Sequence, residues 1–230
     1  MGKSKALVLL SGGQDSTTCL YWAKTKYEHV IALNISYGQR HAIEIKAARQ
    51  IATAEKIPIY NFNTDLFKLI GNSALLESNK DIKSIHKNNK NLPASFVPGR
   101  NIIFLTVAAM FAYKYQIQNI ITGVCMTDYS GYPDCRDTTI EALEKTLTLG
   151  MECAFKIHAP LMHKTKKETV EMAMNLPGCM DALAYSHTCY EGKIPPCGKC
   201  PACKLREKGF SEAGVCDPLI KRLNGEKENG

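Results

Sequence analysis

A buried strand followed at once by a glycine-rich loop constrains this chain more than any other part of its sequence. The apolar run Ala6–Leu10 leads directly into positions 11–16, which read Ser-Gly-Gly-Gln-Asp-Ser. A continuous apolar run of this length is typical of a strand buried on both faces of a parallel sheet. The glycine pair can take positive φ and let a ligand approach the backbone, and free N–H groups at the next helix start favour an anion such as phosphate. The stretch therefore predicts a phosphate-binding turn between the first strand and the first helix.

The apolar pattern after this turn predicts an α/β fold. Val30–Ile35, Ile57–Phe62 and Asn119–Val124 are short apolar runs typical of strands, and stretches with helical periodicity separate them. Strands that alternate with helices form a doubly wound, mostly parallel sheet, which binds its ligands beside the carboxyl ends of the strands. We expect a Rossmann-like domain of this kind over residues 1–180 and a small zinc-binding module with a tail over residues 181–230.

Several helix starts are expected at the ligand-binding edge of the sheet. Capping boxes at Thr138–Glu141 and Thr165–Glu168 each predict a helix, and the first of these helices is expected to end at Gly150. Arg100 and Lys166 lie in the first turns of expected helices. A cation at this position opposes the helix dipole, so a bound anion explains Arg100 better than helix stability does. For Lys166, which is favoured over its neighbour Lys167, a phosphate contact and simple solvation explain the residue equally well.

Four of the ten cysteines lie close together near the C-terminus, namely Cys189, Cys197, Cys200 and Cys203. The last three are spaced by two residues each, with Gly or Pro between them, which bends the backbone so that the thiolates converge on one ion. Tetrahedral zinc is the favoured ion. An iron–sulfur cluster is the alternative, although its fourth cysteine would follow closely and precede proline in a ferredoxin. Four protein ligands leave no open position, which predicts a structural site.

Composition and charge limit the classes of protein that fit. With 45% hydrophobic residues the chain can bury a substantial core. Its N-terminal apolar run of about five residues is too short for a secretory signal, and no stretch approaches the roughly 20 apolar residues of a membrane span, so we expect a cytoplasmic protein without a membrane partner. The net charge of +7 permits a nucleic-acid partner. A phosphate-rich substrate explains the charge equally well, and the lysine clusters lack the interleaved aromatics of a single-strand binding surface, so no nucleic-acid partner is predicted.

The Lys- and Asn-rich residues 78–91 are interpreted as a solvated loop, in preference to a lid.

The order of the motifs resembles that of one enzyme family. Positions 11–16 are similar to the signature of the PP-loop ATP pyrophosphatases, and the whole chain from about Leu7 to Phe210 resembles the 7-cyano-7-deazaguanine synthases of the queuosine pathway. The segments that carry the resemblance are Ser11–Cys19, Tyr37–His41, Phe96–Asn101, Thr122–Val124, Tyr129–Arg136 and Cys189–Cys203.

This resemblance implies a function in detail. The family converts 7-carboxy-7-deazaguanine and ammonia to the nitrile at the cost of ATP, through an adenylated acid and an adenylated amide, and each stage releases AMP and pyrophosphate. A ligase forming C–N bonds with AMP-type rather than ADP-type cleavage is therefore expected, with one zinc per chain, Mg²⁺ and a homodimeric assembly.

The resemblance also suggests roles for individual residues. Asp15, Lys166 and Arg100 are the expected catalytic residues, with Asp15 orienting Mg²⁺ and the two cations stabilising charge on the phosphates. The expected ATP-binding residues are Leu9, Leu10, Ser11, Gly12, Gly13, Gln14, Asp15, Ser16, Thr17 and Thr18. The expected substrate contacts are Arg40 or Arg136 on the carboxylate, Asp128 or Asp134 on the N–H edge of the base, and Tyr132.

Two other classes of function remain as alternatives from the sequence. A PP-loop enzyme that thiolates tRNA would share the ATP loop and fit the basic charge, but it would need a catalytic cysteine pair and an RNA-binding domain. A zinc-knuckle nucleic-acid binder with a degenerate loop is the second. Release of AMP, measured with and without tRNA, distinguishes them.

Overall fold

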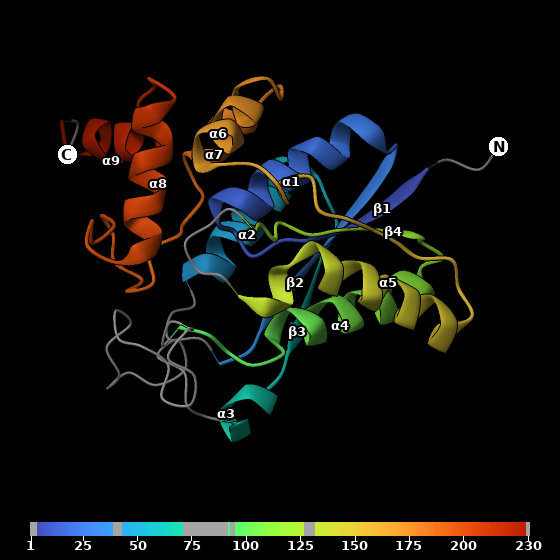
Figure 1. Ribbon diagram of the computed structural model, residues 1–230. Coiled ribbons are helices and arrows are strands. Elements are labelled where there is room, and N and C mark those ends of the chain that lie inside the picture. The colour runs from blue at the N-terminus through green and yellow to red at the C-terminus, as the bar shows by residue number, and fades with distance from the viewer. Residues whose placement is uncertain (1–3, 39–42, 71–91, 93–94, 127–131, 229–230) are drawn as a thin grey trace.

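A computed structural model describes residues 4–38, 43–70, 92, 95–126 and 132–228 of the chain (Figure 1). Its centre is a five-stranded sheet in the order β3-β2-β1-β4-β5, in which all neighbouring strands are parallel. The strands are β1 (Lys5–Leu9), β2 (His29–Ser36), β3 (Ile59–Asn63), β4 (Asn119–Ile121) and β5 (Lys156–His158). The strand order reverses between β1 and β4, and a parallel α/β sheet binds its ligands at such a switch point.

Helices cover both faces of this sheet, so the doubly wound architecture expected from the sequence is confirmed. The helices are α1 (Gln14–Lys26), α2 (Ile43–Ala54), α3 (Leu66–Ile70), α4 (Arg100–Lys114), α5 (Asp137–Met151), α6 (Lys166–Met174), α7 (Cys179–Leu183), α8 (Pro201–Glu212) and α9 (Pro218–Glu228), with a short 3₁₀ turn η1 (Pro133–Cys135) before α5.

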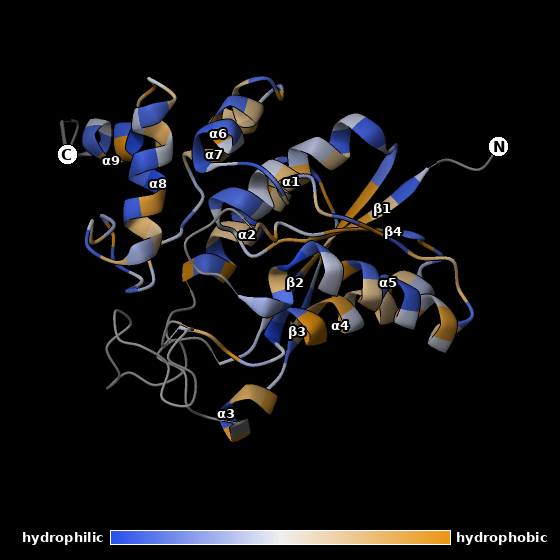
Figure 2. Cartoon of the chain, in the orientation of Figure 1, coloured by the Kyte–Doolittle hydropathy of each residue, from blue (hydrophilic) through white to orange (hydrophobic). Residues whose placement is uncertain are grey.

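The alternation of side chains along β1 builds two hydrophobic cores. Ala6 and Val8 are fully buried in a cluster with residues of α1, α2, α6 and α7, whereas Leu7 is fully buried in a second cluster with residues of α4 and α5. Successive strand residues point to opposite faces, which explains why β1 is apolar at every position after the exposed Lys5. Figure 2 shows the same pattern, with hydrophobic colouring concentrated on the strands and hydrophilic turns on the outer helices.

The capping predictions have different outcomes. The box at Thr165 is confirmed, because its hydroxyl accepts from Glu168 N at 3.2 Å and the Glu168 carboxylate accepts from Thr165 N at 2.7 Å. The box at Thr138 is wrong. The turn η1 leads directly into α5, so the helix begins at Asp137 after Arg136 and has no side-chain cap. The expected stop at Gly150 is also wrong, since α5 continues to Met151 and is capped by Glu152, which has a positive φ of 49°.

Helix α8 in the C-terminal segment packs against the sheet domain. Phe210 on α8 is buried in the cluster that covers α1 and α6. Arg206, which is 4% exposed, forms an ion pair with Asp217 at 2.6 Å and donates to the hydroxyl of Ser186 at 2.8 Å. The domain boundary expected near residue 180 stays a prediction. The packing of Phe210 joins the segments on its two sides, whereas the contacts of Arg206 lie within residues 181–230.

Candidate active site

Glycine is required at position 12 by its backbone conformation and by its neighbours. Gly12 has φ of 92°, and a Cβ there would lie 2.2 Å from the carbonyl oxygen of Glu44 and 2.7 Å from the N of Ala48. Helix α2 therefore packs directly on the loop. Helix α1 begins after Gly13 without a side-chain cap, which leaves the N–H groups of its first turn available to an anion.

The loop opens into a cavity of about 320 Å³ at the carboxyl ends of β1, β2 and β4. Its wall includes the expected residues Leu9, Leu10, Ser11, Gly13, Gln14, Asp15, Ser16, Arg100, Tyr132 and Lys166. The end of β4 lies close to the loop, because a Cβ on Gly123 would be 3.1 Å from Ser16 N. The cavity therefore lies at the switch point between β1 and β4, where the fold predicts a ligand.

Asp15 and Lys166 form an ion pair in this cavity, although 150 residues separate them in the chain. Lys166 Nζ lies 2.6 Å from Asp15 Oδ2. The other carboxylate oxygen, Asp15 Oδ1, is buried and has no hydrogen-bond partner among the described residues. A buried carboxylate oxygen without a partner suits a hard cation such as Mg²⁺, so the residues present fit the expected metal. Gly209 of α8 packs on Lys166, since a Cβ there would lie 2.9 Å from Lys166 Cβ.

Arg100 lies against aromatic rings on the far side of the cavity. Its Nη1 donates to the hydroxyl of Tyr37 at 3.4 Å, and its guanidinium carbon is 5.8 Å and 5.7 Å from the ring centres of Tyr37 and Tyr132. The Tyr132 hydroxyl is in turn paired with Ser95 Oγ at 2.7 Å. The rings hold the guanidinium by cation–π attraction while its charge remains in the cavity.

Glu44 is a cavity residue that the sequence analysis missed. It lies in the first turn of α2 and lines the cavity. Burial raises the pKa of its carboxyl to about 7, and the nearby Arg100 only partly opposes that rise. The sequence does contain a signal for this residue. Glu44 is acidic and lies at the start of an expected helix, a few residues after Arg40 and His41 at the polar end of a strand.

A substitution of Glu44 has a predictable effect on stability. The carboxyl is protonated in both states below its ordinary pKa of 4.5, whereas above about 7 the folded protein must bury a charge that the unfolded chain exposes. Stability of the wild type therefore falls as pH rises through this window. We expect Glu44→Gln to raise the melting temperature by about 2–4 °C at pH 8 and by much less at pH 5. Thermal melts at the two pH values test this, and an equal shift at both would contradict it.

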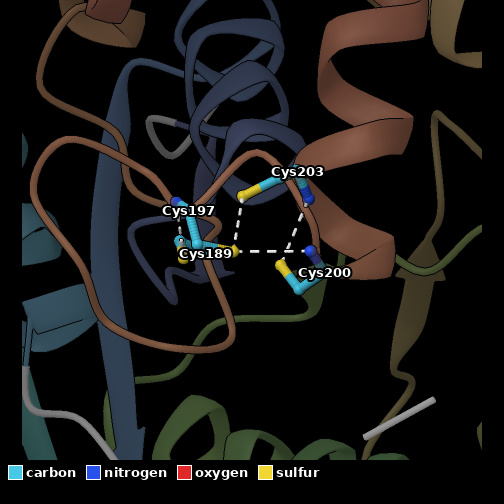
Figure 3. A group of neighbouring side chains, drawn as sticks. All are labelled: Cys189, Cys197, Cys200 and Cys203. Carbon is cyan, nitrogen blue, oxygen red and sulfur yellow. Dashed lines mark hydrogen bonds between the residues drawn. The ribbon is translucent and has the colours of Figure 1, made fainter.

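The four C-terminal cysteines converge as expected (Figure 3). The sulfurs of Cys189, Cys197, Cys200 and Cys203 all lie within 4.8 Å of one another, and those of Cys197 and Cys203 are 3.9 Å apart. A tetrahedral zinc with bonds of about 2.3 Å holds its sulfurs about 3.8 Å apart, so this donor set fits the ion with small adjustments. Cys19, Cys125, Cys135 and Cys179 are buried elsewhere.

The cysteine segment also forms part of the cavity wall. Thr188, Cys189 and Tyr190 line the cavity, and His187 N donates to Gly12 O at 2.8 Å. A group bound to the cysteines therefore holds in place a chain segment that touches the phosphate loop.

Comparison with known proteins decides the family. Residues 5–214 match the sequence model described as queuosine biosynthesis protein QueC. The chain belongs to the QueC family. Its relatives include the 7-cyano-7-deazaguanine synthases of Chromobacterium violaceum and Laribacter hongkongensis, each 50% identical, with 97% and 96% of this chain and 96% of each relative covered. The synthase of Wolinella succinogenes is 46% identical over 92% of this chain and 94% of its own.

Among solved structures, this QueC-family chain is similar to the NH3-dependent NAD synthetase from Campylobacter jejuni. The TM-score is 0.45 at 14% identity, with 100% of this chain and 86% of that one covered. A predicted subunit of tRNA methyltransferase from Methanocaldococcus jannaschii gives 0.48 at 20% identity, with 74% of each chain covered.

Some expected site residues of this QueC-family chain lie away from the cavity. The expected ATP contacts Thr17 and Thr18 are fully buried in α1, and their hydroxyls donate to Gly13 O at 2.8 Å and Gln14 O at 3.0 Å. These bonds secure the helix start instead. Gly12 is likewise absent from the cavity wall and allows the close approach of α2.

Two of the expected substrate contacts do not line the cavity in the structure, and their role in substrate binding stays a prediction. Asp134 is 4% exposed, and its Oδ2 accepts from Asn101 N at 2.9 Å, so it anchors the start of α4 rather than facing a ligand. Arg136, which follows η1, is exposed and is not among the residues that line the cavity. Arg40 and Asp128 lie outside the described residues, as does the expected loop at 78–91.

Proposed function

We propose that this chain is a 7-cyano-7-deazaguanine synthase, which converts 7-carboxy-7-deazaguanine, ammonia and ATP to the nitrile with release of AMP and pyrophosphate. The observation that carries the proposal is the single cavity in which the Ser-Gly-Gly loop, Asp15 with Lys166, and Arg100 face one another. The backbone amides of the loop suit the phosphates of ATP. The two cations suit these phosphates and the substrate carboxylate that receives AMP. The names of relatives that match this chain over nearly their full length support the same reaction.

Adenylation makes the chemistry possible, because a carboxylate is a poor electrophile. Attack of the substrate carboxylate on the α-phosphorus breaks the bond to pyrophosphate. Lys166 and Arg100 stabilise the negative charge that builds on the phosphate oxygens. Ammonia then displaces AMP to give the amide, and a second adenylation, on the amide oxygen, permits elimination to the nitrile. Because the first stage joins ammonia to carbon at the expense of ATP, the proposed enzyme is a ligase that forms a C–N bond with AMP-type cleavage.

Two metals would assist without entering these steps. Asp15 would hold Mg²⁺ through its unpartnered oxygen, and the ion would neutralise charge on the pyrophosphate. Zinc on the four cysteines would serve as a structural ion, because the four thiolates leave no coordination position open to substrate.

The assembly and location follow from the same family resemblance. We infer a homodimer in the cytoplasm, without a nucleic-acid partner. Met110 and Tyr113 support an interface, since each is 58% exposed on α4 and they lie one turn apart. Among the described residues, none of the helices has the length and apolarity that crossing a membrane requires. Light scattering tests the dimer as twice the chain mass of 25.5 kDa.

The stoichiometry of the reaction tests the function directly. With 7-carboxy-7-deazaguanine, ammonium and ATP, we expect the nitrile as the final product, two AMP per nitrile, and an amide that accumulates transiently and is itself accepted as a substrate. Mass spectrometry of the base and quantification of AMP measure all three. An end product at the amide mass, or AMP formed one-to-one with nitrile, contradicts the mechanism. Release of AMP that requires tRNA instead would favour the thiolation-type alternative.

A further inference from the structure

We propose that Glu44 is the general base of this site, and that its carboxylate accepts the N–H proton in both the amide-forming and the nitrile-forming step. This inference rests on the proposed function and adds to it a residue that neither ATP binding nor adenylation uses.

Two carboxylates line the described part of the cavity, and only one of them is available to a substrate proton. Asp15 is paired with Lys166 at 2.6 Å through Oδ2, and its Oδ1 is the oxygen proposed to hold Mg²⁺. Glu44 has no hydrogen bond or ion pair to any described residue, and it lines the same cavity from the first turn of α2. A carboxylate that lines a ligand cavity without an internal partner is placed to meet a group of the ligand.

The position of Glu44 along the wall also fits this role. Its backbone carbonyl packs on Gly12, so the residue lies beside the phosphate loop, and Arg100 is close enough to oppose its change in pKa. We place the proposed adenylate between those two features, because the loop amides suit the phosphates and Arg100, which lines the same cavity, suits the negative charge that develops on the phosphate oxygens. Glu44 is therefore next to the carbon at which nitrogen arrives.

Both nitrogen steps need a proton acceptor. In the first step the lone pair of ammonia forms the C–N bond, the C–O bond to AMP breaks with its electron pair on the phosphate oxygen, and an N–H proton passes to Glu44. In the second step the amide is adenylated on oxygen and loses one N–H proton to solvent, which gives the imidate. The imidate then loses its remaining N–H proton to Glu44, that electron pair completes the nitrile, and AMP departs again. Glu44 releases each proton to solvent between steps, so one carboxylate serves both nitrogen steps of a single catalytic cycle.

The surroundings of Glu44 keep its proton affinity near the working pH. The charged and titratable described groups that interact with it are Arg100 from α4, Tyr37 after β2, and Tyr190 from the cysteine segment. Burial outweighs the positive charge of Arg100 and raises the pKa of Glu44 to about 7. A base is most effective when its pKa lies near the ambient pH, since it is then both deprotonated and basic enough to accept.

Exchange of labelled pyrophosphate into ATP separates adenylation from the nitrogen steps. The test measures this exchange with 7-carboxy-7-deazaguanine and no ammonium, and then measures nitrile formation with saturating ammonium. For Glu44→Gln we expect exchange within about twofold of wild type and nitrile formation lower by about 10²- to 10⁴-fold. Glu141→Gln, which removes an exposed carboxylate of α5 outside the cavity, should leave both rates unchanged.

Each other outcome has a definite meaning. Equal loss of exchange and nitrile formation in Glu44→Gln overturns the base and assigns Glu44 to substrate binding, while the proposed function survives. If the wild type shows no exchange, adenylation itself is contradicted, and the proposed role of Glu44 as general base is contradicted too. A second measurement follows the ratio of wild-type to Glu44→Gln nitrile rates with pH, which cancels the titration of ammonium. The ratio should rise through pH 7 and level off above it, whereas a flat ratio overturns the proposal.

Discussion

We expect Asp15→Asn to lower nitrile formation and pyrophosphate exchange by about 10³-fold or more, with little change in melting temperature. The substitution keeps the shape of the side chain but removes its charge. It therefore takes from Lys166 its ion-pair partner and from the phosphates the oxygen that suits Mg²⁺. The side chain belongs to a loop that faces the cavity, and its charged atoms contribute nothing to the two hydrophobic cores.

The chain offers a matched control for this change. Asp65 and Lys68 form an ion pair on the surface, with side chains 79% and 58% exposed, so Asp65→Asn breaks the same kind of contact outside the cavity. Exposed pairs contribute about 0–1 kcal/mol, and we expect this variant to keep full activity. Both rates should be measured together with circular dichroism. A folded Asp15→Asn protein that works at a near-normal rate would refute the assignment of the loop.

Cys200→Ser should remove the bound metal and lower the melting temperature by about 10 °C. Cys200 is 4% exposed and begins α8, where its sulfur accepts from Cys203 N at 3.5 Å. Because a structural ion couples its binding energy to folding, we assign its loss about 3–5 kcal/mol, and each kcal/mol shifts the melting temperature of a domain this size by about 2–4 °C. Metal analysis of the wild type should find about one zinc per chain and little iron.

The cavity should respond to the same substitution. Thr188 and Tyr190 line the cavity on either side of Cys189, so a chain that has lost its metal should bind substrate more weakly as well as melt earlier. Cys216→Ser is the control, because Cys216 is exposed and lies outside the cluster. Stoichiometric iron with a visible absorbance band would show that the cysteines hold an iron–sulfur cluster and not zinc. An unchanged metal content in Cys200→Ser would refute the ligand set.

Local features account for the predictions that succeeded. The turn at positions 11–16 depends on a buried strand and two glycines that are adjacent in the chain, and the cysteine cluster depends on spacings of two and seven residues. The capping box at Thr165 was readable because its two hydrogen bonds span only three residues. The box at Thr138 failed because a 3₁₀ turn, which has no comparable signature, starts α5 earlier.

The sequence by itself determined the Ser-Gly-Gly turn, the alternation of strands and helices, and the convergence of the four cysteines, because each arises from residues close enough in the chain to set their own backbone geometry. The tertiary structure alone decided which polar side chains face the cavity. Asp134 and Glu44 are both acidic residues at the ligand edge, yet packing buried the first against the backbone of Asn101 and left the second facing Arg100. Likewise Lys166 meets Asp15 only because the sheet order brings α6 to α1. The charge and spacing of residues in the sequence do not predict which side chains face the cavity. That outcome depends on which atoms of distant segments come within hydrogen-bonding distance of one another.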